Sequence, residues 1–188
     1  MKRVFIAIDI DDEFRYKIGK VINMLNGLNL PDIRLVKTDN IHITLKFLNT
    51  IDEERINDVL EALTGIGNRF SITKSRVTKF GVFPNMKKPH VLWLGIDNSK
   101  EQFSKIAQFI DNSLGVYGFE KDNRPFSPHI TLGRFKKPIH DLPTYFNKLD
   151  KPEIDINIST VSVYESKLYQ SGPIYRVIKT FHLTKKEE

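Results

Sequence analysis

Apolar and polar residues alternate along the N-terminal segment of the chain. Val4, Ile6 and Ile8 fall on one side of residues 3–10, and Phe5 falls on the other. A period of two residues is typical of a β-strand with one face in a core. We therefore predict a strand here, with Phe5 on the face that looks away from the core.

Three segments repeat apolar residues at the spacing of an amphipathic helix. The first begins at Asp11 or Asp12. The second is predicted to be capped by Asp52, and the third to begin with a capping box of Ser99 and Gln102. The apolar stripes are Phe14, Ile18, Val21, Ile22 and Leu25; Ile56, Val59, Leu60 and Leu63; and Phe103, Ile106, Ala107, Ile110 and Leu114.

Further strands are predicted in the central and C-terminal parts of the chain. They cover residues 70–80, 90–96, 154–158 and 175–183. A connection from Pro138 to Pro143 leads to a short predicted helix around Tyr145. Val161 and Val163 are out of phase with the isoleucines that precede them, which predicts a bulge or bend between the two runs.

One tetrapeptide, His-Ile-Thr-Leu, occurs twice. It starts at His42 and again at His129, 129 − 42 = 87 residues later. Residues two apart on a strand share a face, so each histidine is expected to lie beside its threonine, Thr44 or Thr131. The apolar neighbours, Phe47 among them, are expected to pack inward.

The repeat predicts pseudo-symmetry within one unit. No Gly/Ser-rich or Pro-rich stretch separates the two copies, so residues 1–188 are expected to form a single bilobal domain. The mixture of helices and strands predicts an α+β fold. If the lobes pack with the two motif strands side by side, two imidazoles and two hydroxyls meet at one spot, which suits a phosphate.

The residue types fit hydrolysis of a cyclic phosphodiester. That reaction removes a proton from water and delivers another to the departing ribose oxygen, and histidine titrates near neutrality. Each well-placed acid or base contributes ~10²–10⁴ in rate, so a pair supplies much of the acceleration without a metal. Thr44 and Thr131 can donate hydrogen bonds to the non-bridging oxygens without adding charge.

Other interpretations of the histidines are weaker. A single histidine on a strand is more often structural, but packing alone would accept Val or Ile at both positions. His90, His140 and His182 lack a threonine two residues later and are expected to be structural or exposed. Two histidines without cysteines fall short of the usual zinc ligand set, so we expect no metal site.

Two cations near the motifs are candidates for phosphate binding. Arg134 suits a two-pronged contact with phosphate oxygens, but strict alternation from His129 aims it away from the site. Gly133 permits a bulge that would turn it back. Lys46 shares the face of His42 by the same alternation and either assists there or is a plain surface lysine.

Composition narrows the class of protein. The chain has 188 residues, 40% of them apolar, and no cysteine, which excludes disulfides and thiolate chemistry. The formal charge of +6 favours a polyanionic partner, although a solvated basic surface is the plain alternative. No apolar run reaches membrane-spanning length, and we expect a cytoplasmic protein that begins at Met1 and does not bind membranes.

At these motifs the sequence resembles the 2H phosphoesterase superfamily, and within it the RNA 2′,3′-cyclic phosphodiesterase family, also known as 2′-5′ RNA ligases. The words that carry the resemblance are RVFIAID, NIHITLKFL, FSPHITLGRF and VYESKL. They span nearly the whole chain. The resemblance implies a bilobal fold with antiparallel sheets lining a central cleft, helices outside, and no cofactor or metal.

The resemblance also implies a substrate and site roles. The substrate is RNA ending in 2′,3′-cyclic phosphate, hydrolysed to a 2′-phosphomonoester, with reversible 2′-5′ joining of tRNA halves. His42 and His129 are the catalytic pair, while Thr44, Thr131 and Arg134 bind the phosphate. The pseudo-symmetry does not distinguish acid from base, and we choose His42 as general acid and His129 as general base. Phe5 and Arg134 hold the terminal base between them, unless Phe5 instead fills the interface between the lobes.

Four further points are expectations or alternatives. The family usually has Gly where this chain has Asn49, and we expect the turn to survive because Asn tolerates left-handed backbone. The substrate could instead be 2′-5′ oligoadenylate or ADP-ribose 1″,2″-cyclic phosphate. The protein could also be a non-catalytic module that binds RNA ends. We expect a monomer.

Overall fold

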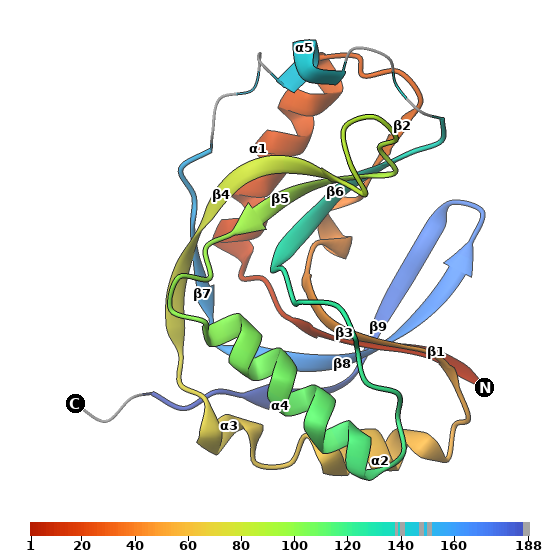
Figure 1. The fold of residues 1–188 in the computed structure, drawn as a ribbon, viewed down its shortest axis with the longest axis vertical. Helices are drawn as coiled ribbons and strands as arrows, with labels where there is room; N and C mark the ends of the chain where they lie inside the picture. The colour runs from red at the N-terminus through yellow and green to blue at the C-terminus, as the bar shows by residue number, and fades with distance from the viewer. Residues whose placement is uncertain (138, 140–141, 147–148, 150–151, 186–188) are drawn as a thin grey trace.

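The structure of the protein is a computed structural model that describes residues 1–137, 139, 142–146, 149 and 152–185. Its strands form two antiparallel sheets, with helices outside them (Figure 1). The α+β prediction is therefore confirmed. His140 and part of the predicted connection from Pro138 to Pro143 lie outside the described residues. None of the described helices is both long and apolar enough to cross a bilayer.

The first sheet has four strands in the order β3-β1-β8-β9. Their bounds are Lys2–Ile8 for β1, Ile43–Ile51 for β3, Thr160–Tyr169 for β8 and Gly172–His182 for β9. The alternation in the N-terminal segment predicts β1 well, because its core face carries three fully buried residues, Val4, Ile6 and Ile8.

The second sheet has five strands in the order β2-β6-β5-β4-β7. Their bounds are Ile33–Leu35 for β2, Thr73–Phe83 for β4, Val91–Ile96 for β5, His129–Phe135 for β6 and Asp155–Ile158 for β7. The bend predicted before Val161 proves to be a change of sheet: β7 pairs with β4, whereas β8 pairs with β1.

The helices are α1 (Asp12–Gly27), α2 (Arg55–Ala62), α3 (Ile66–Arg69), α4 (Gln102–Val116), α5 (Leu142–Phe146) and the short 3-10 helix η1 (Thr38–Asn40). The two longest helices, α1 and α4, cross from one sheet to the other. α1 follows β1 of the first sheet and packs on the second, whereas α4 follows β5 of the second sheet and packs on the first. The Asp11 side chain, at the start of α1, accepts a 3.3 Å hydrogen bond from Asn157 of β7, while α4 contacts β3 and α2. This exchange ties the two sheets together.

Two predicted helix caps are wrong. Asp52 does not cap α2 with its side chain; the helix begins at Arg55 after a turn in which the Asp52 carbonyl accepts from the Arg55 amide. Ser99 does not form a capping box, because it bonds to Asp97 instead. The Asn98 side chain accepts from the Phe103 amide at 3.2 Å and does the capping of α4.

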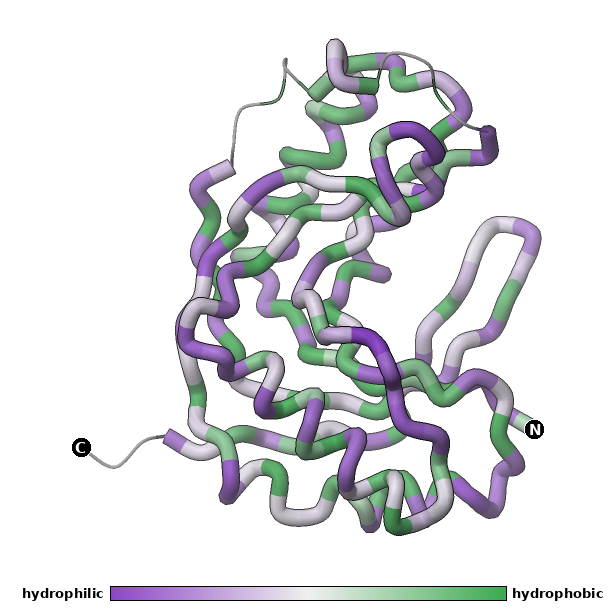
Figure 2. Tube along the Cα trace, viewed as in Figure 1, coloured by the Kyte–Doolittle hydropathy of each residue, from purple (hydrophilic) through white to green (hydrophobic). Residues whose placement is uncertain are grey.

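One connected hydrophobic core runs through both sheets and includes Ile6 of β1 and Leu94 of β5, both fully buried. Figure 2 shows apolar residues recurring along the inner strands and a strongly hydrophilic stretch in the loop that follows α4. That loop, residues 117–128, leads directly into β6. The core thus fixes the strands on which the two His-Ile-Thr-Leu motifs lie.

Candidate active site

The two repeated motifs face each other from different sheets. His42 immediately precedes β3, at the edge of the first sheet, and His129 begins β6 of the second. β3 and β6 are in contact although they belong to different sheets. The charge of His129 lowers the pKa of His42, so the two rings are near enough to interact electrostatically.

Each histidine is oriented by the same backbone contact. His42 Nδ1 lies 2.8 Å from the carbonyl oxygen of Asn40, and His129 Nδ1 lies 2.7 Å from that of Ser127. A carbonyl can only accept, so Nδ1 donates in both rings and Nε2 is left as the reactive atom. Side-chain patterns could not reveal these partners, because every residue carries a carbonyl and only the fold selects one.

Burial holds both histidines in the neutral form. Loss of solvent lowers the pKa of His42 to about 4, outweighing the hydrogen bond to Asn40, which raises it. Burial also lowers the pKa of His129, and the Arg134 charge adds to that effect. A neutral imidazole can accept a proton at pH 7. An imidazole that must donate one gains it most readily when a phosphate anion lies between the rings.

Aromatic side chains surround each imidazole. Phe5 lies 4.8 Å from His42 between ring centroids, and Tyr175 meets the same ring edge-on at 5.2 Å. On the other side of the site, Phe83 meets His129 edge-on at 5.0 Å. Neither Tyr175 nor Phe83 stands out in the sequence, because their position in each strand gives no signal that they meet a histidine.

Phe5 is not open to a nucleobase in this structure. It is only 2% exposed, and its ring stacks on Tyr164 at 5.0 Å with an interplanar angle of 9°. The buried ring is packed among aromatic side chains of its own sheet, which leaves no room for a base against it in this structure and does not place it between the lobes. Phe5 also packs against the His42 ring, at an interplanar angle of 35°.

A chain of hydrogen bonds holds Tyr164 in turn. Its hydroxyl donates to Asp9, whose other carboxylate oxygen accepts from Ser162 at 2.6 Å. Ser162 also bonds to Thr180 at 2.7 Å. Burial and the Asp9 charge raise the pKa of Tyr164, so this hydroxyl stays protonated and acts as a fixed donor. The network fixes the ring on which Phe5 stacks.

Both motifs carry a β-bulge at the same place. Across from β1, Ala7 pairs with Thr44 and Ile6 pairs with Lys46, so one residue of β3 has no partner. Across from β5, Trp93 pairs with Thr131 and the following pair skips a residue of β6 in the same way. In each copy the extra residue is the motif leucine, which reverses the faces of the residues that directly follow it.

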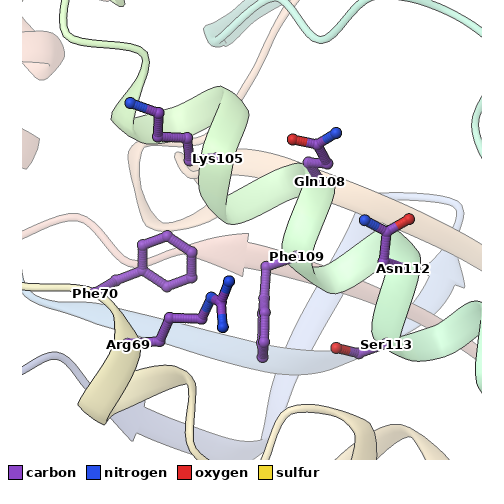
Figure 3. Close-up of a pocket in the computed structure, with 7 residues that line it drawn as sticks. All are labelled: Arg69, Phe70, Lys105, Gln108, Phe109, Asn112 and Ser113. Atoms are coloured by element: carbon purple, nitrogen blue, oxygen red, sulfur yellow. The ribbon is translucent and has the colours of Figure 1, made fainter.

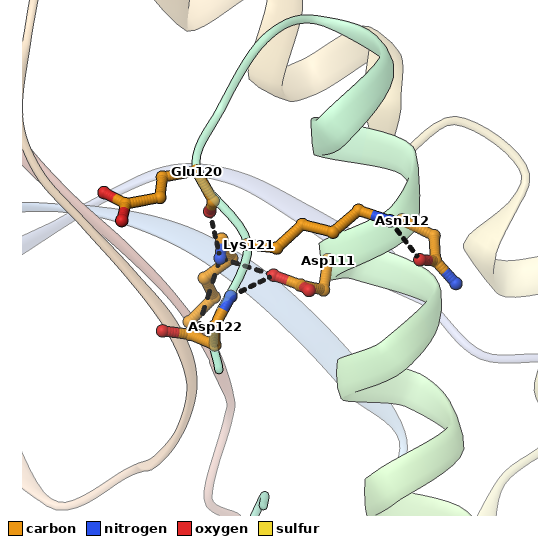
Figure 4. Close-up of polar contacts among 6 residues, drawn as sticks. Asp111, Asn112, Glu120, Lys121 and Asp122 are labelled. Atoms are coloured by element: carbon orange, nitrogen blue, oxygen red, sulfur yellow. Dashed lines mark hydrogen bonds and ion pairs between the residues drawn. The ribbon is translucent and has the colours of Figure 1, made fainter. Parts of the chain in front are cut away.

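The bulge in β3 overturns two predictions. Lys46 does not share the face of His42: it is 4% exposed and donates to Asp111 at 2.5 Å and to the Glu120 carbonyl at 2.9 Å. Figure 4 shows Asp111 of α4 facing Glu120 and Asp122 of the following loop. Phe47 does not pack inward; it is 53% exposed and lies on the face of Thr44.

The bulge in β6 turns Arg134 toward the face of the histidine, whereas the bulge in β3 turns Lys46 away from it. Gly133 comes directly after the extra residue, as its conformational freedom led us to expect, and Arg134 returns to the face of Thr131. The exposed guanidinium lowers the pKa of both His129 and Tyr175, so its charge reaches both sheets. Arg134 and Phe47 thus occupy equivalent positions after the two motifs.

The turn at Asn49 survives as expected. Asn49 has φ 57°, in the left-handed region that the family glycine would occupy, and it pairs with Val4 where the β1–β3 register shifts again.

A separate hollow lies outside the region of the histidines. Arg69, Phe70, Lys105 and Phe109 line this cavity of about 510 Å³ between α3 and α4 (Figure 3). The Arg69 guanidinium lies 5.4 Å from the centre of the Phe109 ring. None of the predicted site residues lines it, so we place the candidate site at the two histidines.

The fold and the site define a class of protein. The family model of LigT-like phosphoesterases matches residues 8–93 and 94–175, one match after the other along the chain. The chain belongs to the LigT-like phosphoesterase family, within the 2H superfamily, and the resemblance seen in the sequence is confirmed.

Individual relatives support the same assignment. The chain is 32% identical over 176 residues to a protein of Thermotoga maritima, covering 94% of this chain and 92% of the relative. It is 33% identical over 182 residues to one of Methanocaldococcus jannaschii, covering 94% and 98%. Both are named RNA 2′,3′-cyclic phosphodiesterase.

Solved structures share the fold. A structure from Thermus thermophilus matches with a TM-score of 0.80 at 22% identity, covering 98% of this chain and 100% of that one. E. coli LigT complexed with 3′-AMP matches with a TM-score of 0.75 at 23% identity, covering 98% and 99%.

Proposed function

We propose that the protein hydrolyses RNA 2′,3′-cyclic phosphate ends to 2′-phosphomonoesters. The single observation that carries the proposal is the matched pair His42 and His129, each presenting Nε2 from an equivalent strand of a different sheet. The relatives named RNA 2′,3′-cyclic phosphodiesterase support the same substrate class.

The reaction needs one proton acceptor and one proton donor. We assign His129 as the base that takes the proton from water as its oxygen attacks phosphorus. We assign His42 as the acid that gives a proton to the ribose 3′ oxygen as the P–O3′ bond breaks. The products are a 2′-phosphomonoester and a 3′ hydroxyl, and each histidine exchanges its proton with solvent afterwards.

The opposite assignment has one observation in its favour. The pKa of His42 is lowered to about 4, so His42 is the histidine that is less readily protonated before substrate binds. A cyclic phosphate with sulfur in place of the 3′ oxygen separates the two assignments, because a thiolate leaves without general-acid assistance. Under our assignment, His42→Ala regains activity on the thio substrate and His129→Ala does not.

The remaining site residues are assigned to binding. Thr44 and Thr131 lie half-buried two residues after the histidines and can donate to the non-bridging phosphate oxygens. Arg134 supplies the positive charge. Phe47 is exposed on the same face of the first sheet, and we assign the terminal base to Phe47 and Arg134 in place of Phe5.

The same chemistry accounts for ligation. When the 5′ hydroxyl of a second RNA replaces the attacking water, the product is a 2′-5′ phosphodiester and the step is the reverse of its cleavage. We therefore include reversible joining of tRNA halves in the proposal, without a metal or other cofactor.

The test is incubation with an oligonucleotide that ends in 2′,3′-cyclic phosphate, followed by identification of the product as a 2′- or 3′-monoester. Turnover to the 2′-monoester that persists in EDTA is expected. Side-by-side assays of 2′-5′ oligoadenylate and ADP-ribose 1″,2″-cyclic phosphate test the other 2H substrates. If no substrate turns over and the His42→Ala and His129→Ala variants bind RNA ends like wild type, the protein is a binding module.

A further inference from the structure

The end of the β8–β9 hairpin extends beyond the rest of its sheet. β1 pairs with β8 only between Val161 and Glu165, whereas β8 and β9 remain paired to each other as far as Tyr169 and Gly172. The hairpin from the Glu165–Arg176 pair to its tip therefore forms a two-stranded arm, which projects from the body of the molecule in Figure 1. Near its tip the arm is tied to η1, because the Asn40 side chain donates to the Pro173 carbonyl at 2.9 Å.

The two faces of the arm differ in what they adjoin. Phe5 pairs with Tyr164, so the face of Tyr164 continues the surface that carries His42 and its aromatic shell. The residues of this site face are Tyr164, Ser166, Leu168, Pro173, Tyr175 and Val177. The opposite face carries Glu165, Lys167, Tyr169, Ile174 and Arg176.

Three exposed arginines from three strands lie beside the arm, two of them near Tyr175 on its site face and one at its tip. Arg3 of β1 lies two residues before Phe5 and so shares its face. Arg3 and Arg134 both lower the pKa of Tyr175, which places both charges near its hydroxyl. Arg34 of β2 lies directly opposite Arg134 and so shares its face of the second sheet. It also reaches the turn at the tip of the arm, since a Cβ atom placed on Gly172, the partner of Tyr169, would lie 3.1 Å from Arg34 Nη2.

This cluster of like charges lacks acidic partners. Arg34 and Arg134 are directly opposite each other in the β2–β6 register, an arrangement that is unfavourable for two cations. Within the described part of the chain, none of the three arginines forms an ion pair with a carboxylate, whereas Lys46 and Arg55 do. An anion between the two sheets would relieve this repulsion.

We propose that the RNA strand leading to the cyclic phosphate binds along the site face of the β8–β9 arm, held by Arg3 and Arg34. The proposal rests on the function proposed above and deepens it, because it makes an oligonucleotide rather than a single nucleotide the preferred substrate. Arg134 belongs to both the phosphate site and the arginine cluster. An RNA strand whose terminal phosphate lies at the histidines therefore leaves the site past Tyr175. The half-buried Tyr175 ring, beside the exposed Leu168 and Val177 and near the arginines, suits contact with unpaired bases and a phosphate backbone.

The experiment compares three variants on two substrates. Arg3→Ala and Arg34→Ala remove the cluster, and Arg176→Ala removes an exposed arginine from the opposite face of the same arm. Adenosine 2′,3′-cyclic phosphate and a hexanucleotide ending in 2′,3′-cyclic phosphate are compared by kcat/KM. Affinity for the same hexanucleotide ending in a 2′-phosphate is measured by fluorescence anisotropy between 50 and 200 mM salt, with polyglutamate as competitor.

In wild type, kcat/KM is expected to be at least ~10-fold higher for the hexanucleotide than for the mononucleotide, which is the gain from about 1.4 kcal/mol of added binding. Arg3→Ala and Arg34→Ala reduce that ratio, and each lowers the slope of log affinity against log salt by about 0.7, the value for one phosphate contact on a single strand. Arg176→Ala leaves ratio and slope at the wild-type values.

Two results would overturn the RNA path: equal effects of Arg3→Ala, Arg34→Ala and Arg176→Ala on binding, or displacement of RNA by an equal charge of polyglutamate. Turnover of the mononucleotide with either result leaves the proposed function standing. Absence of turnover on both substrates removes the proposed function. The anisotropy measurement then still tests whether RNA binds along the site face of the β8–β9 arm, because binding requires no catalysis.

Discussion

Lys46 Nζ lies 2.5 Å from Asp111 Oδ1, and this contact joins the strand of the first motif to the helix that precedes the second. Asp111 Oδ1 also accepts from the Asp122 amide at 3.1 Å, in the loop that continues to Ser127 and His129. The pair is therefore a mechanical link between the two halves of the site. It lies on the far side of β3 from the phosphate position.

Removing the carboxylate of this pair is expected to destabilise the protein. Asp111→Ala leaves the 4%-exposed Lys46 side chain without its principal partner, and breaking a buried pair on one side costs about 3–5 kcal/mol. Chemical denaturation measures the change. The control is Asp122→Asn, whose carboxylate is 59% exposed and 3.3 Å from Lys46, with an expected cost under about 1 kcal/mol. Equal effects of the two variants would contradict the link.

Replacing either catalytic histidine is expected to reduce the rate of cyclic phosphate hydrolysis strongly. His42→Ala and His129→Ala should each lower kcat by ~10²–10⁴, the usual contribution of one acid or base. The double variant should lose less than the product of the two factors, since the histidines act on one reaction as a unit. His182→Ala, at an exposed position, serves as the control, and single-turnover assays give the rates. Wild-type rates in either single variant would remove that histidine from the mechanism.

The pH dependence of kcat/KM is expected to be bell-shaped and centred below pH 6.5. The free enzyme needs a neutral base and a protonated acid, so the rate rises as the base loses its proton and falls as the acid loses its own. The pKa values of both histidines lie below 6.5, which moves both limbs to lower pH. A bound phosphate anion raises the pKa of the acid, so the bell for kcat should lie at higher pH. A kcat/KM optimum above pH 7.5 would contradict the prediction.

Folding stability is expected to fall as the pH is lowered from about 6.5 to about 4. The pKa of His42 is lowered to about 4 in the folded state, while the unfolded chain takes up the proton at its ordinary value. The full stability is present above pH 6.5, and on the order of 3 kcal/mol is lost by pH 4, at 1.36 kcal/mol per pKa unit. Urea titrations of wild type and His42→Gln give the difference. The variant should lose less stability over this window than wild type.

We also expect one cooperative unfolding transition. The core is continuous through both sheets, and α1 and α4 are each exchanged between them, so we propose that residues 1–188 fold as a single bilobal unit. Calorimetric and van't Hoff enthalpies should agree. Two separate transitions, or a stable fragment containing residues 1–93 alone, would show independent lobes.

Local patterns predicted most of the elements. The buried stripe of α4, for example, contains Phe103, Ile106 and Leu114 as expected, because helical spacing and burial are both set by neighbours along the chain. The caps were harder. Asn98 was missed because several polar residues precede α4, and the choice among them depends on the path of the loop from β5.

Residue order alone also singled out His42 and His129, since a repeated tetrapeptide needs no knowledge of the fold. It could not place Lys46, Phe47 and Arg134 on the correct faces. Their orientations depend on bulges, and a bulge arises from how two strands far apart in sequence align their hydrogen bonds, not from the propensity of either strand. The approach of Arg3 and Arg134 to Tyr175, with Arg34 opposite Arg134, likewise required the tertiary structure, because four separate strands had to be brought together before these charges could lie near one another.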